Sequence, residues 1–198
     1  DEGILLIEKH LINNNILIEE KLVGDEFSLF TLCDGVNCIH LPPVQDYKRA
    51  YENDEGPNTG GMGSIMDDFD FLNEQDISIC ENLNSEVLMK ITKQFCMNYI
   101  GILYGSFMKT NTGELKLIEF NCRFGDSEVF NLLNCIDDLS SVFKDMINKN
   151  LKSVNIKSIK SVVKYLVPRG YPNSSLCKTI QYEKMNNVYA SSLNNENY

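Results

Sequence analysis

Apolar and polar residues follow two different periods along this chain, and the change of period separates predicted helices from predicted strands. Between Ile79 and Phe95, apolar side chains recur every three or four residues, which predicts a long amphipathic helix over residues 76–99. Similar spacing predicts helices over residues 4–12, 127–134 and 139–148. Short alternating or continuous apolar runs predict strands over residues 16–20, 26–33, 36–41, 101–109, 115–122 and 160–168.

Turn residues join some of these strands directly and leave one long connection. Asp34-Gly35 predicts a two-residue hairpin turn, and Asn-Thr-Gly at 111–113 predicts a second turn. Residues 42–63 contain many Gly, Pro and Asn residues, and we expect one long loop there, of the kind that often covers a functional site. The order of elements predicts an α+β fold with a mainly antiparallel sheet and flanking helices.

Residues 117–126 carry the clearest sign of chemistry. An apolar strand there presents Glu119, Asn121 and Arg123 at alternate positions, so these side chains should share one face while residues 118, 120 and 122 pack behind them. Two oxygen donors beside a guanidinium suit Mg²⁺ or Mn²⁺ carrying a phosphate. An edge strand with a solvated polar face would give the same alternation.

The predicted loop over residues 42–63 favours the metal and phosphate interpretation. Gly60, Gly61 and Gly63 allow backbone amides to approach an anion closely. Lys48 and Arg49 add positive charge to an otherwise acidic chain. A mobile surface turn is the alternative interpretation of the glycines alone.

Several short motifs follow one another along the chain. They are Ile-Glu-Glu at 18–20, Gly-Asp-Glu-Phe-Ser at 24–28, Gln-Asp-Tyr-Lys-Arg-Ala-Tyr at 45–51, Gly-Pro-Asn-Thr-Gly-Gly-Met-Gly at 56–63, Leu-Tyr-Gly at 103–105, Ile-Glu-Phe-Asn-Cys-Arg-Phe-Gly-Asp at 118–126 and Gly-Tyr-Pro at 170–172. In these motifs and their order, from about residue 16 to residue 172, the chain resembles the glycinamide ribonucleotide synthetases (phosphoribosylamine–glycine ligases), ATP-grasp enzymes of purine synthesis.

The resemblance implies a domain organisation. Residues 1–156 would form the large lobe of an ATP-grasp fold, and residues 157–198 would begin a small C-terminal domain. An N-terminal domain and a small ATP-grasp lobe would precede residue 1, so we expect the chain to be a fragment whose partner is the missing N-terminal part of the same enzyme. On its own the fragment is expected to have little or no ligase activity.

The resemblance also implies a role for individual residues. Glu119 and Asn121 would hold Mg²⁺ or Mn²⁺, while Arg123 and Asp126 would act in catalysis. ATP would contact Glu19, Glu20, Leu22 and Glu26. The substrates glycine and 5-phosphoribosylamine would contact Asp46, Lys48, Arg49, Asn58, Thr59, Gly60 and Gly61. Glycine would first attack ATP to give glycyl phosphate, and the amine of 5-phosphoribosylamine would then attack the activated carbonyl.

Several positions depart from the family pattern. Ser106 stands where many members have a further metal ligand, and a hydroxyl is the weaker donor. Tyr47 replaces a histidine and so removes a group that titrates near neutral pH. Ser127 replaces a proline at the start of a predicted helix.

Composition limits the other possibilities. A net charge of −10 argues against nonspecific nucleic-acid binding, and no apolar run is long enough to cross a membrane. The seven cysteines include no C-x-x-C pair, which is typical of reduced thiols in a cytoplasmic protein. Two alternatives stay open: another ATP-grasp carboxylate–amine or carboxylate–thiol ligase, and an inactive remnant that binds a partner.

Overall fold

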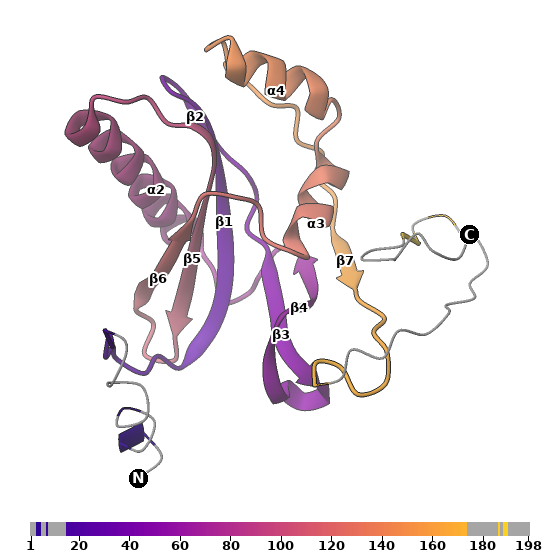
Figure 1. Cartoon of the computed structure of the whole chain (residues 1–198). Coiled ribbons are helices and arrows are strands. Elements are labelled where there is room, and N and C mark those ends of the chain that lie inside the picture. Colours follow the sequence, from indigo (N-terminus) through magenta and orange to yellow (C-terminus); the bar gives the residue numbers. More distant parts are fainter. Residues whose placement is uncertain (1–2, 5–6, 8–14, 174–185, 187, 190–198) are drawn as a thin grey trace.

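The computed structural model describes residues 3–4, 7, 15–173, 186 and 188–189. Four antiparallel strands form the first sheet in the order β2-β1-β5-β6 (Figure 1). Their bounds are Gly24–Asp34 for β1, Cys38–His40 for β2, Ile100–Thr110 for β5 and Leu115–Asn121 for β6. The long β1–β5 ladder pairs every residue of the two strands, from Gly24 opposite Thr110 to Asp34 opposite Ile100.

A second antiparallel sheet has the order β3-β4-β7. The strands are β3 (Gln45–Tyr51), β4 (Glu55–Met66) and β7 (Ser161–Lys164), and the short 3-10 helix η1 (Glu52–Asp54) lies between the first two. The expectation of one long loop over residues 42–63 is therefore wrong. Gly and Pro are uncommon inside strands, and here Gly63 allows close approach, since a side chain at this position would lie 2.4 Å from the carbonyl oxygen of Val163 on β7.

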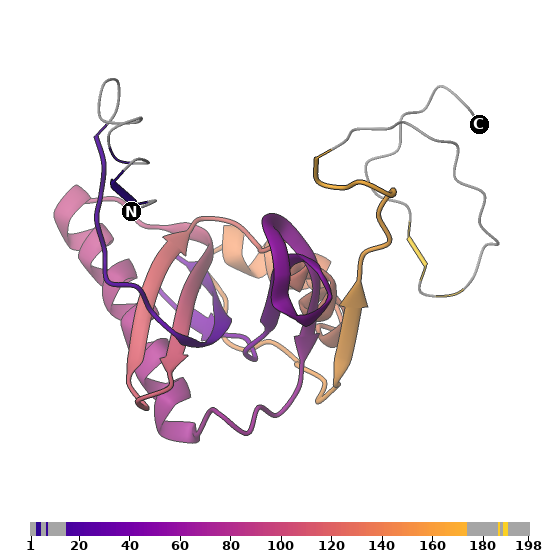
Figure 2. The ribbon, with the colours of Figure 1, turned by 90° about the horizontal axis from the view of Figure 1, so that it is seen from below.

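Helices cover the first sheet from both sides. The long helix α2 (Glu74–Phe95) packs on one face, and α3 (Glu128–Cys135) and α4 (Leu139–Ile147) lie on the other side of the sheet, as Figures 1 and 2 show from two directions. A reciprocal capping box starts α2, because the Asn73 side chain accepts from the Asp76 N–H while the Asp76 carboxylate accepts from the Asn73 N–H.

Both faces of β1 are buried, which explains its nearly continuous apolar sequence. Phe27 and Leu29 pack with Cys80 of α2 and Phe107 of β5 in one core. Neighbouring β1 residues point to the opposite face, where a larger core includes Phe30, Leu32, Val44, Tyr104, Leu132, Val142 and Met146. Because β1 is buried on both faces, it fixes the positions of its own side chains and of the strands β2 and β5 that pair with it.

Most of the predicted elements are confirmed, with shifted ends. The predicted helices over 76–99, 127–134 and 139–148 correspond to α2, α3 and α4, and the α+β fold is confirmed. The predicted strand over 16–20 is wrong, because this segment pairs with no strand and leaves Leu17 and Ile18 exposed. The predicted helix over 4–12 falls mostly outside the described residues. The proposed boundary at residue 156 stays a prediction, although β7 beyond it pairs with β4.

The hairpin between β1 and β2 is confirmed, with its turn one residue later than predicted. The Asp34 N–H donates to the carbonyl oxygen of Asn37, so Gly35 and Val36 form the turn. The buried Asp34 carboxylate accepts from the backbone N–H groups of Val36, Asn37 and Leu151, at 2.8, 2.6 and 2.9 Å. Burial alone would raise the pKa of this carboxyl, but the hydrogen bonds outweigh burial and lower the pKa to about 2.

This low pKa predicts a contribution of Asp34 to stability that acid removes. The pKa in the folded protein lies below the value of about 4 in an unfolded chain. The carboxylate therefore stabilises the fold above about pH 4, and the contribution is lost as the pH falls toward 2. Asp34→Asn should lower the free energy of unfolding at neutral pH, and its difference from wild type should shrink across that window. Urea unfolding of both proteins at several pH values measures this; a constant difference would contradict it.

Candidate functional site

A row of polar side chains crosses the first sheet on the face opposite α2. Ser28 of β1 pairs with Ser106 of β5, and Ser106 pairs with Glu119 of β6. Glu26 lies two residues before Ser28 on the same face, and its carboxylate accepts a hydrogen bond of 3.2 Å from the Ser106 hydroxyl. Three neighbouring strands thus bring two carboxylates and two hydroxyls together.

Glu119 and Asn121 share this face, as their alternation predicts. The Asn121 amide donates to Oε1 of Glu119 at 2.8 Å. Of the three residues predicted to pack behind this face, Ile118 and Cys122 are exposed. A register shift opposite Ser106 and Phe107 leaves Ile118 as an extra residue on β6 and exposes it, because β6 lies at the edge of the sheet. Cys122 is also exposed rather than buried, while Phe120 packs against the core as predicted.

Arg123 does not extend the row, because β6 ends at Asn121. The Arg123 guanidinium is exposed, and its Nη1 donates to the carbonyl oxygen of Phe124 at 2.8 Å. Among the described residues, Arg123 forms no ion pair with Glu119, Asp126 or Glu128. The guanidinium would have to turn away from Phe124 to reach a ligand held by Glu119.

Lys48 of β3 links the second sheet to the polar row. Its ammonium contacts the Glu26 carboxylate and lies 3.4 Å from Oδ2 of Asp46. The Asp46 side chain is only 3% exposed, and its Oδ1 has no hydrogen-bond partner among the described residues. A buried oxygen without a donor is costly, so Asp46 is well suited to accept a hydrogen bond from a ligand.

Electrostatics tie these groups together. Burial raises the pKa of Asp46, with the Lys48 ammonium opposing and the Glu26 carboxylate adding to the rise. Burial would lower the pKa of Lys48, but the hydrogen bond to Glu26 and the charges of Asp46 and Glu26 outweigh burial and raise the pKa. The Lys48 ammonium therefore lies between the carboxyls of Glu26 and Asp46, and both of these neighbours raise its pKa.

Glu128 belongs to the same cluster, although it is not among the site residues that the sequence predicts. It is buried at the start of α3, and its Oε1 accepts a hydrogen bond of 3.4 Å from the Ser28 hydroxyl. Burial raises the pKa of Glu128, and the nearby Asp46 carboxylate adds to the rise. The signal that could have revealed it is its place two residues after the motif of residues 118–126, which holds Arg123 and Asp126.

The β3–β4 hairpin is ordered by its own polar residues. The Thr59 hydroxyl donates to the Lys48 carbonyl at 2.8 Å and accepts from the Gly61 N–H at 3.1 Å. Arg49 donates to the Gly56 carbonyl at 2.7 Å and pairs across the hairpin with Asn58, while Gly60 is exposed. Among the described residues, Lys48 is the one predicted substrate residue whose side chain contacts the polar row, through Glu26, and Asp46 contacts Lys48 in turn.

Asp126 packs through its backbone against the β3–β4 hairpin. Its Oδ1 accepts a hydrogen bond from the Tyr165 hydroxyl, and its backbone lies against Gly61, where a side chain would approach the Asp126 carbonyl oxygen to 2.5 Å. Burial raises the pKa of Tyr165, and the hydrogen bond to Asp126 adds to the rise. Residues 123–126 and the glycine-bearing hairpin are therefore brought together.

The predicted ATP residues fall into two groups. Glu19, Glu20 and Leu22 lie in an extended segment before β1, and Glu20 Oε2 is 3.5 Å from the Lys116 ammonium on β6. Glu26 lies instead with Lys48 and Ser106. Within the described parts of the chain, no hydrogen bond or ion pair joins the two groups.

Glu119 and Asn121 fit a magnesium ion bound mainly through phosphates. Among the described residues, no three His, Cys, Asp or Glu side chains are grouped to hold a metal. Mg²⁺ commonly takes only one or two carboxylates and completes its shell with water and phosphate oxygens. The adjacent carboxylate and amide meet that need once the amide oxygen turns toward the cation.

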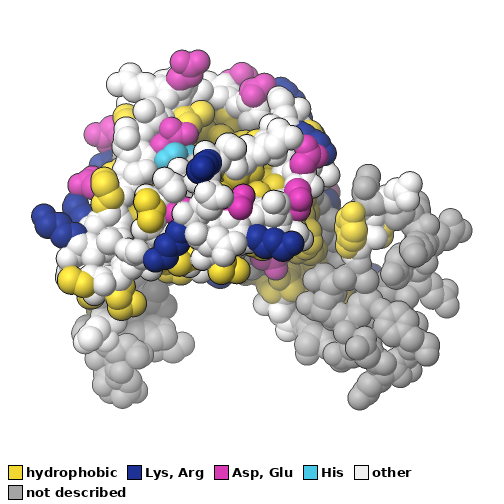
Figure 3. Space-filling model, turned by 90° about the horizontal axis from the view of Figure 1, so that it is seen from above, with side chains coloured by type: hydrophobic (Ala, Val, Ile, Leu, Met, Phe, Trp, Pro, Cys, Tyr) yellow, Lys and Arg dark blue, Asp and Glu magenta, His cyan; other side chains and the backbone are white. Residues whose placement is uncertain are grey.

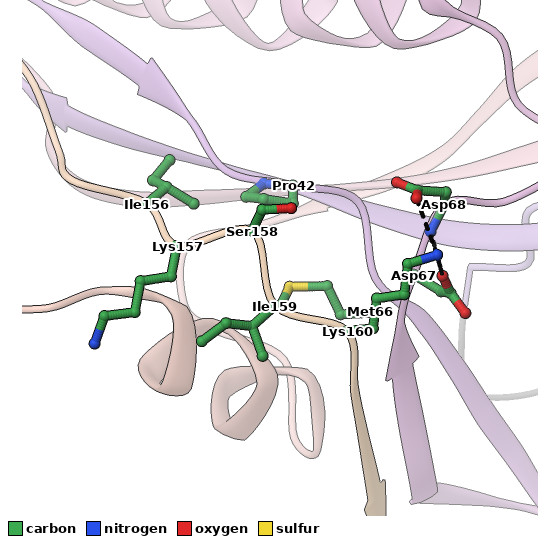
Figure 4. A pocket seen from close by; sticks show the side chains of 9 residues that line it. All are labelled: Pro42, Met66, Asp67, Asp68, Ile156, Lys157, Ser158, Ile159 and Lys160. Atoms are coloured by element: carbon green, nitrogen blue, oxygen red, sulfur yellow. Dashed lines mark hydrogen bonds and ion pairs between the residues drawn. The ribbon is translucent and has the colours of Figure 1, made fainter.

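A separate pocket of about 260 Å³ lies between the end of β4 and the segment before β7 (Figure 4). Met66, Ile156 and Ile159 contribute apolar side chains, and Lys160 forms ion pairs with Asp67 and Asp68 at 2.6 and 3.0 Å. None of the predicted site residues lines it. On the described part of the face in Figure 3, acidic and basic side chains are interspersed and form no continuous basic patch.

Comparison with known proteins assigns the family. The sequence model of one protein family, the phosphoribosylglycinamide synthetase ATP-grasp (A) domain, matches residues 5–129. The chain belongs to this family. A phosphoribosylamine–glycine ligase from Methanothermobacter thermautotrophicus is 39% identical over 176 residues, and one from Methanoregula boonei is 42% identical over 169. These alignments cover 86% and 82% of the chain but only 40% and 39% of the relatives.

Solved structures agree with membership of the synthetase family. The crystal structure of a phosphoribosylamine–glycine ligase from Thermotoga maritima superposes with a TM-score of 0.65 at 31% identity, covering 78% of this chain and 39% of that one. An N5-carboxyaminoimidazole ribonucleotide synthetase from the same organism has a TM-score of 0.51 at 17% identity and shows the shared fold alone. No helix in the described segments is both long and apolar enough to cross a membrane.

Proposed function

We propose that the natural protein carrying these residues joins glycine to 5-phosphoribosylamine at the expense of ATP, through glycyl phosphate, in the cytoplasm. The observation that carries the proposal is the pair Glu119–Asn121 on the same sheet face as Glu26, with Lys48 of the second sheet contacting both Glu26 and Asp46. Family membership supports the same assignment. The alignments leave more than half of each relative unmatched. That the natural protein has a complete active site is therefore itself a proposal.

Phosphoryl transfer needs positioning and charge neutralisation more than covalent help from the protein. Glu119 and Asn121 would hold Mg²⁺ or Mn²⁺, which when bound neutralises charge on the transferring phosphoryl group. Glu19, Glu20 and Leu22 would contact the nucleotide. Lys48 and Ser106 both contact Oε1 of Glu26, so Oε2 would accept from the ribose hydroxyls while Oε1 orients the lysine.

The proposed reaction has two steps. A carboxylate oxygen of glycine attacks the γ-phosphorus of ATP, and the bond to the ADP oxygen breaks. The amine of 5-phosphoribosylamine then attacks the carbonyl carbon of glycyl phosphate, the carbon–oxygen bond to phosphate breaks, and the amine loses a proton. Arg123 would hold the carboxylate and then the acyl phosphate through two parallel N–H groups.

The hairpin residues would bind the second substrate and exclude water. Asp46 Oδ1 has no hydrogen-bond partner among the described residues and would accept from an amine or hydroxyl, and Lys48 supplies a cation beside it. Arg49, Asn58, Thr59, Gly60 and Gly61 would contact the substrates along the hairpin. Asp126 would act with Arg123 by fixing the segment that carries both. Water must be excluded because acyl phosphates hydrolyse.

The test is ADP release by the natural protein with glycine and 5-phosphoribosylamine supplied together. We expect turnover only with both substrates and a divalent cation, and we expect Arg123→Lys to lower kcat strongly because lysine cannot make two parallel hydrogen bonds. Turnover with another carboxylate and no dependence on glycine would favour a different ATP-grasp ligase. The absence of nucleotide binding in the natural protein would favour an inactive remnant.

A further inference from the structure

Two thiols face each other across the β1–β2 hairpin, outside the candidate site. Cys33 of β1 and Cys38 of β2 are direct partners in the antiparallel register. The Cys38 thiol donates to the Cys33 sulfur, and the two sulfur atoms lie 3.5 Å apart. Neither residue takes part in the contacts of Glu26, Lys48 or Glu119.

The ladder places this pair at a position whose geometry suits a disulfide. In an antiparallel ladder, hydrogen-bonded and non-hydrogen-bonded pairs alternate. Asp34 donates to Asn37 and Leu41 donates to Phe30, so residues 34 and 30 of β1 belong to hydrogen-bonded pairs. Cys33 and Cys38 therefore form a non-hydrogen-bonded pair, in which the Cα atoms approach to about 4.5 Å. This separation lies within the range that disulfides span, about 4.4–6.8 Å.

The surroundings also prepare one of the two sulfurs for reaction. Cys33 is 4% exposed and accepts hydrogen bonds from the Cys38 thiol and, at 3.4 Å, from the Gly35 N–H. These hydrogen bonds, led by the one from Cys38, outweigh burial and lower the pKa of Cys33 to about 7. Donating that hydrogen bond raises the pKa of Cys38 in turn. A thiolate is the reactive form of cysteine, and Cys33 is the thiol poised to supply it.

We propose that Cys33 and Cys38 are a redox-modification site that peroxide converts to a reversible cross-strand disulfide. The Cys33 thiolate attacks one oxygen of hydrogen peroxide, the O–O bond breaks, and the departing hydroxide takes a proton and leaves as water. The Cys38 sulfur, on losing its proton, attacks the resulting Cys33 sulfenic acid. The S–O bond breaks and a second water leaves, so two thiols and one peroxide give one disulfide and two waters.

The chain offers a specific way to detect this bond. Asp34 lies between the two cysteines, so cleavage on the amino side of aspartate separates Cys33, in residues 25–33, from Cys38, in residues 34–45. The full chain with Cys96, Cys122 and Cys177 replaced by Ser removes the two exposed thiols and the one outside the described residues. Cys80 and Cys135 remain as buried internal controls.

After treatment with hydrogen peroxide and alkylation under denaturing conditions, we expect fragments 25–33 and 34–45 to stay joined and to separate on reduction. Cys80 and Cys135 should carry the alkyl label. Cys33→Ser in the same background should lose the link and leave Cys38 alkylated, while circular dichroism confirms that the variant is folded. Separate fragments with both cysteines labelled would overturn the proposal. A link from Cys33 or Cys38 to any other cysteine would overturn it as well.

Discussion

Glu119→Gln should lower the metal-dependent turnover of the natural protein by about 10²–10³-fold in kcat/KM, the loss typical when a group that stabilises transition-state charge is removed. Glutamine keeps the size and the hydrogen-bonding capacity of the side chain, so the Asn121 amide still has a partner. The negative charge that attracts the cation is lost. Because Glu119 is exposed at the edge of the sheet, the substitution should leave the free energy of unfolding nearly unchanged.

Variants of Asn121 separate the oxygen donor from the shape of the side chain. Asn121→Asp keeps an oxygen ligand and adds charge, so it should bind Mg²⁺ or Mn²⁺ and retain part of the activity. Asn121→Leu has a similar size and no donor, so it should behave like Glu119→Gln. Glu86→Gln is the matched control, since Glu86 is an exposed carboxylate on α2 that pairs with Lys90 at 2.7 Å and lies outside the candidate site. Its removal should have no effect on turnover.

The decisive measurement is the dependence of rate on metal concentration. Loss of a ligand should raise the metal concentration needed for half-maximal rate as well as lower the rate itself. If Glu119→Gln and Asn121→Leu lowered the rate without changing the metal dependence, the pair would not be the metal site. If Glu86→Gln lowered the rate as much as Glu119→Gln, the cause would be the loss of negative charge in general and not the loss of a metal ligand.

Local periodicity was enough to place Glu119 and Asn121 but not their neighbours. Alternation assumes an unbroken ladder, and the register shift beside Ser106 adds Ile118 as an extra residue on β6. The strand then ends before Arg123. The register shift and the end of β6 both depend on how β6 pairs with β5. The alternation of residues within β6 contains no information about that pairing.

The contacts of the hairpin could not be predicted from its own sequence, because they depend on distant partners. Lys48 meets Glu26 on another sheet, and the Ser64 hydroxyl donates to Asn131 of α3 at 2.6 Å. Motif resemblance predicts a functional role for Asp46 and Lys48, but only the fold shows that Asp46 has a buried oxygen without a donor among the described residues. Glu128 was missed for the same reason, since its role as a buried acid depends on Ser28 and the faces that enclose it.

Gly61 and Gly60 offer a test of what the hairpin glycines do. Gly61→Ala should destabilise the protein by about 3 kcal/mol, because Gly61 has φ 142°, where other residues are strained, and a new methyl group would lie 2.5 Å from the Asp126 carbonyl oxygen. The hairpin would have to move away from the segment that carries Arg123. We therefore also expect a large loss of turnover, measured in kcat, in molecules that remain folded.

Gly60→Ala is the matched control on the neighbouring residue. Apart from its two chain neighbours, no described residue has an atom within 4 Å of a side chain added at Gly60, so this variant should change the free energy of unfolding by no more than about 0.5 kcal/mol. If Gly60 contacts a substrate through its backbone, as we propose, the added methyl group should raise KM and leave stability unchanged. Urea unfolding and steady-state kinetics of both variants separate the two roles. Equal stability of Gly61→Ala and Gly60→Ala would contradict the close approach of Gly61 to Asp126, and with it the packing that holds the hairpin against the Arg123 segment.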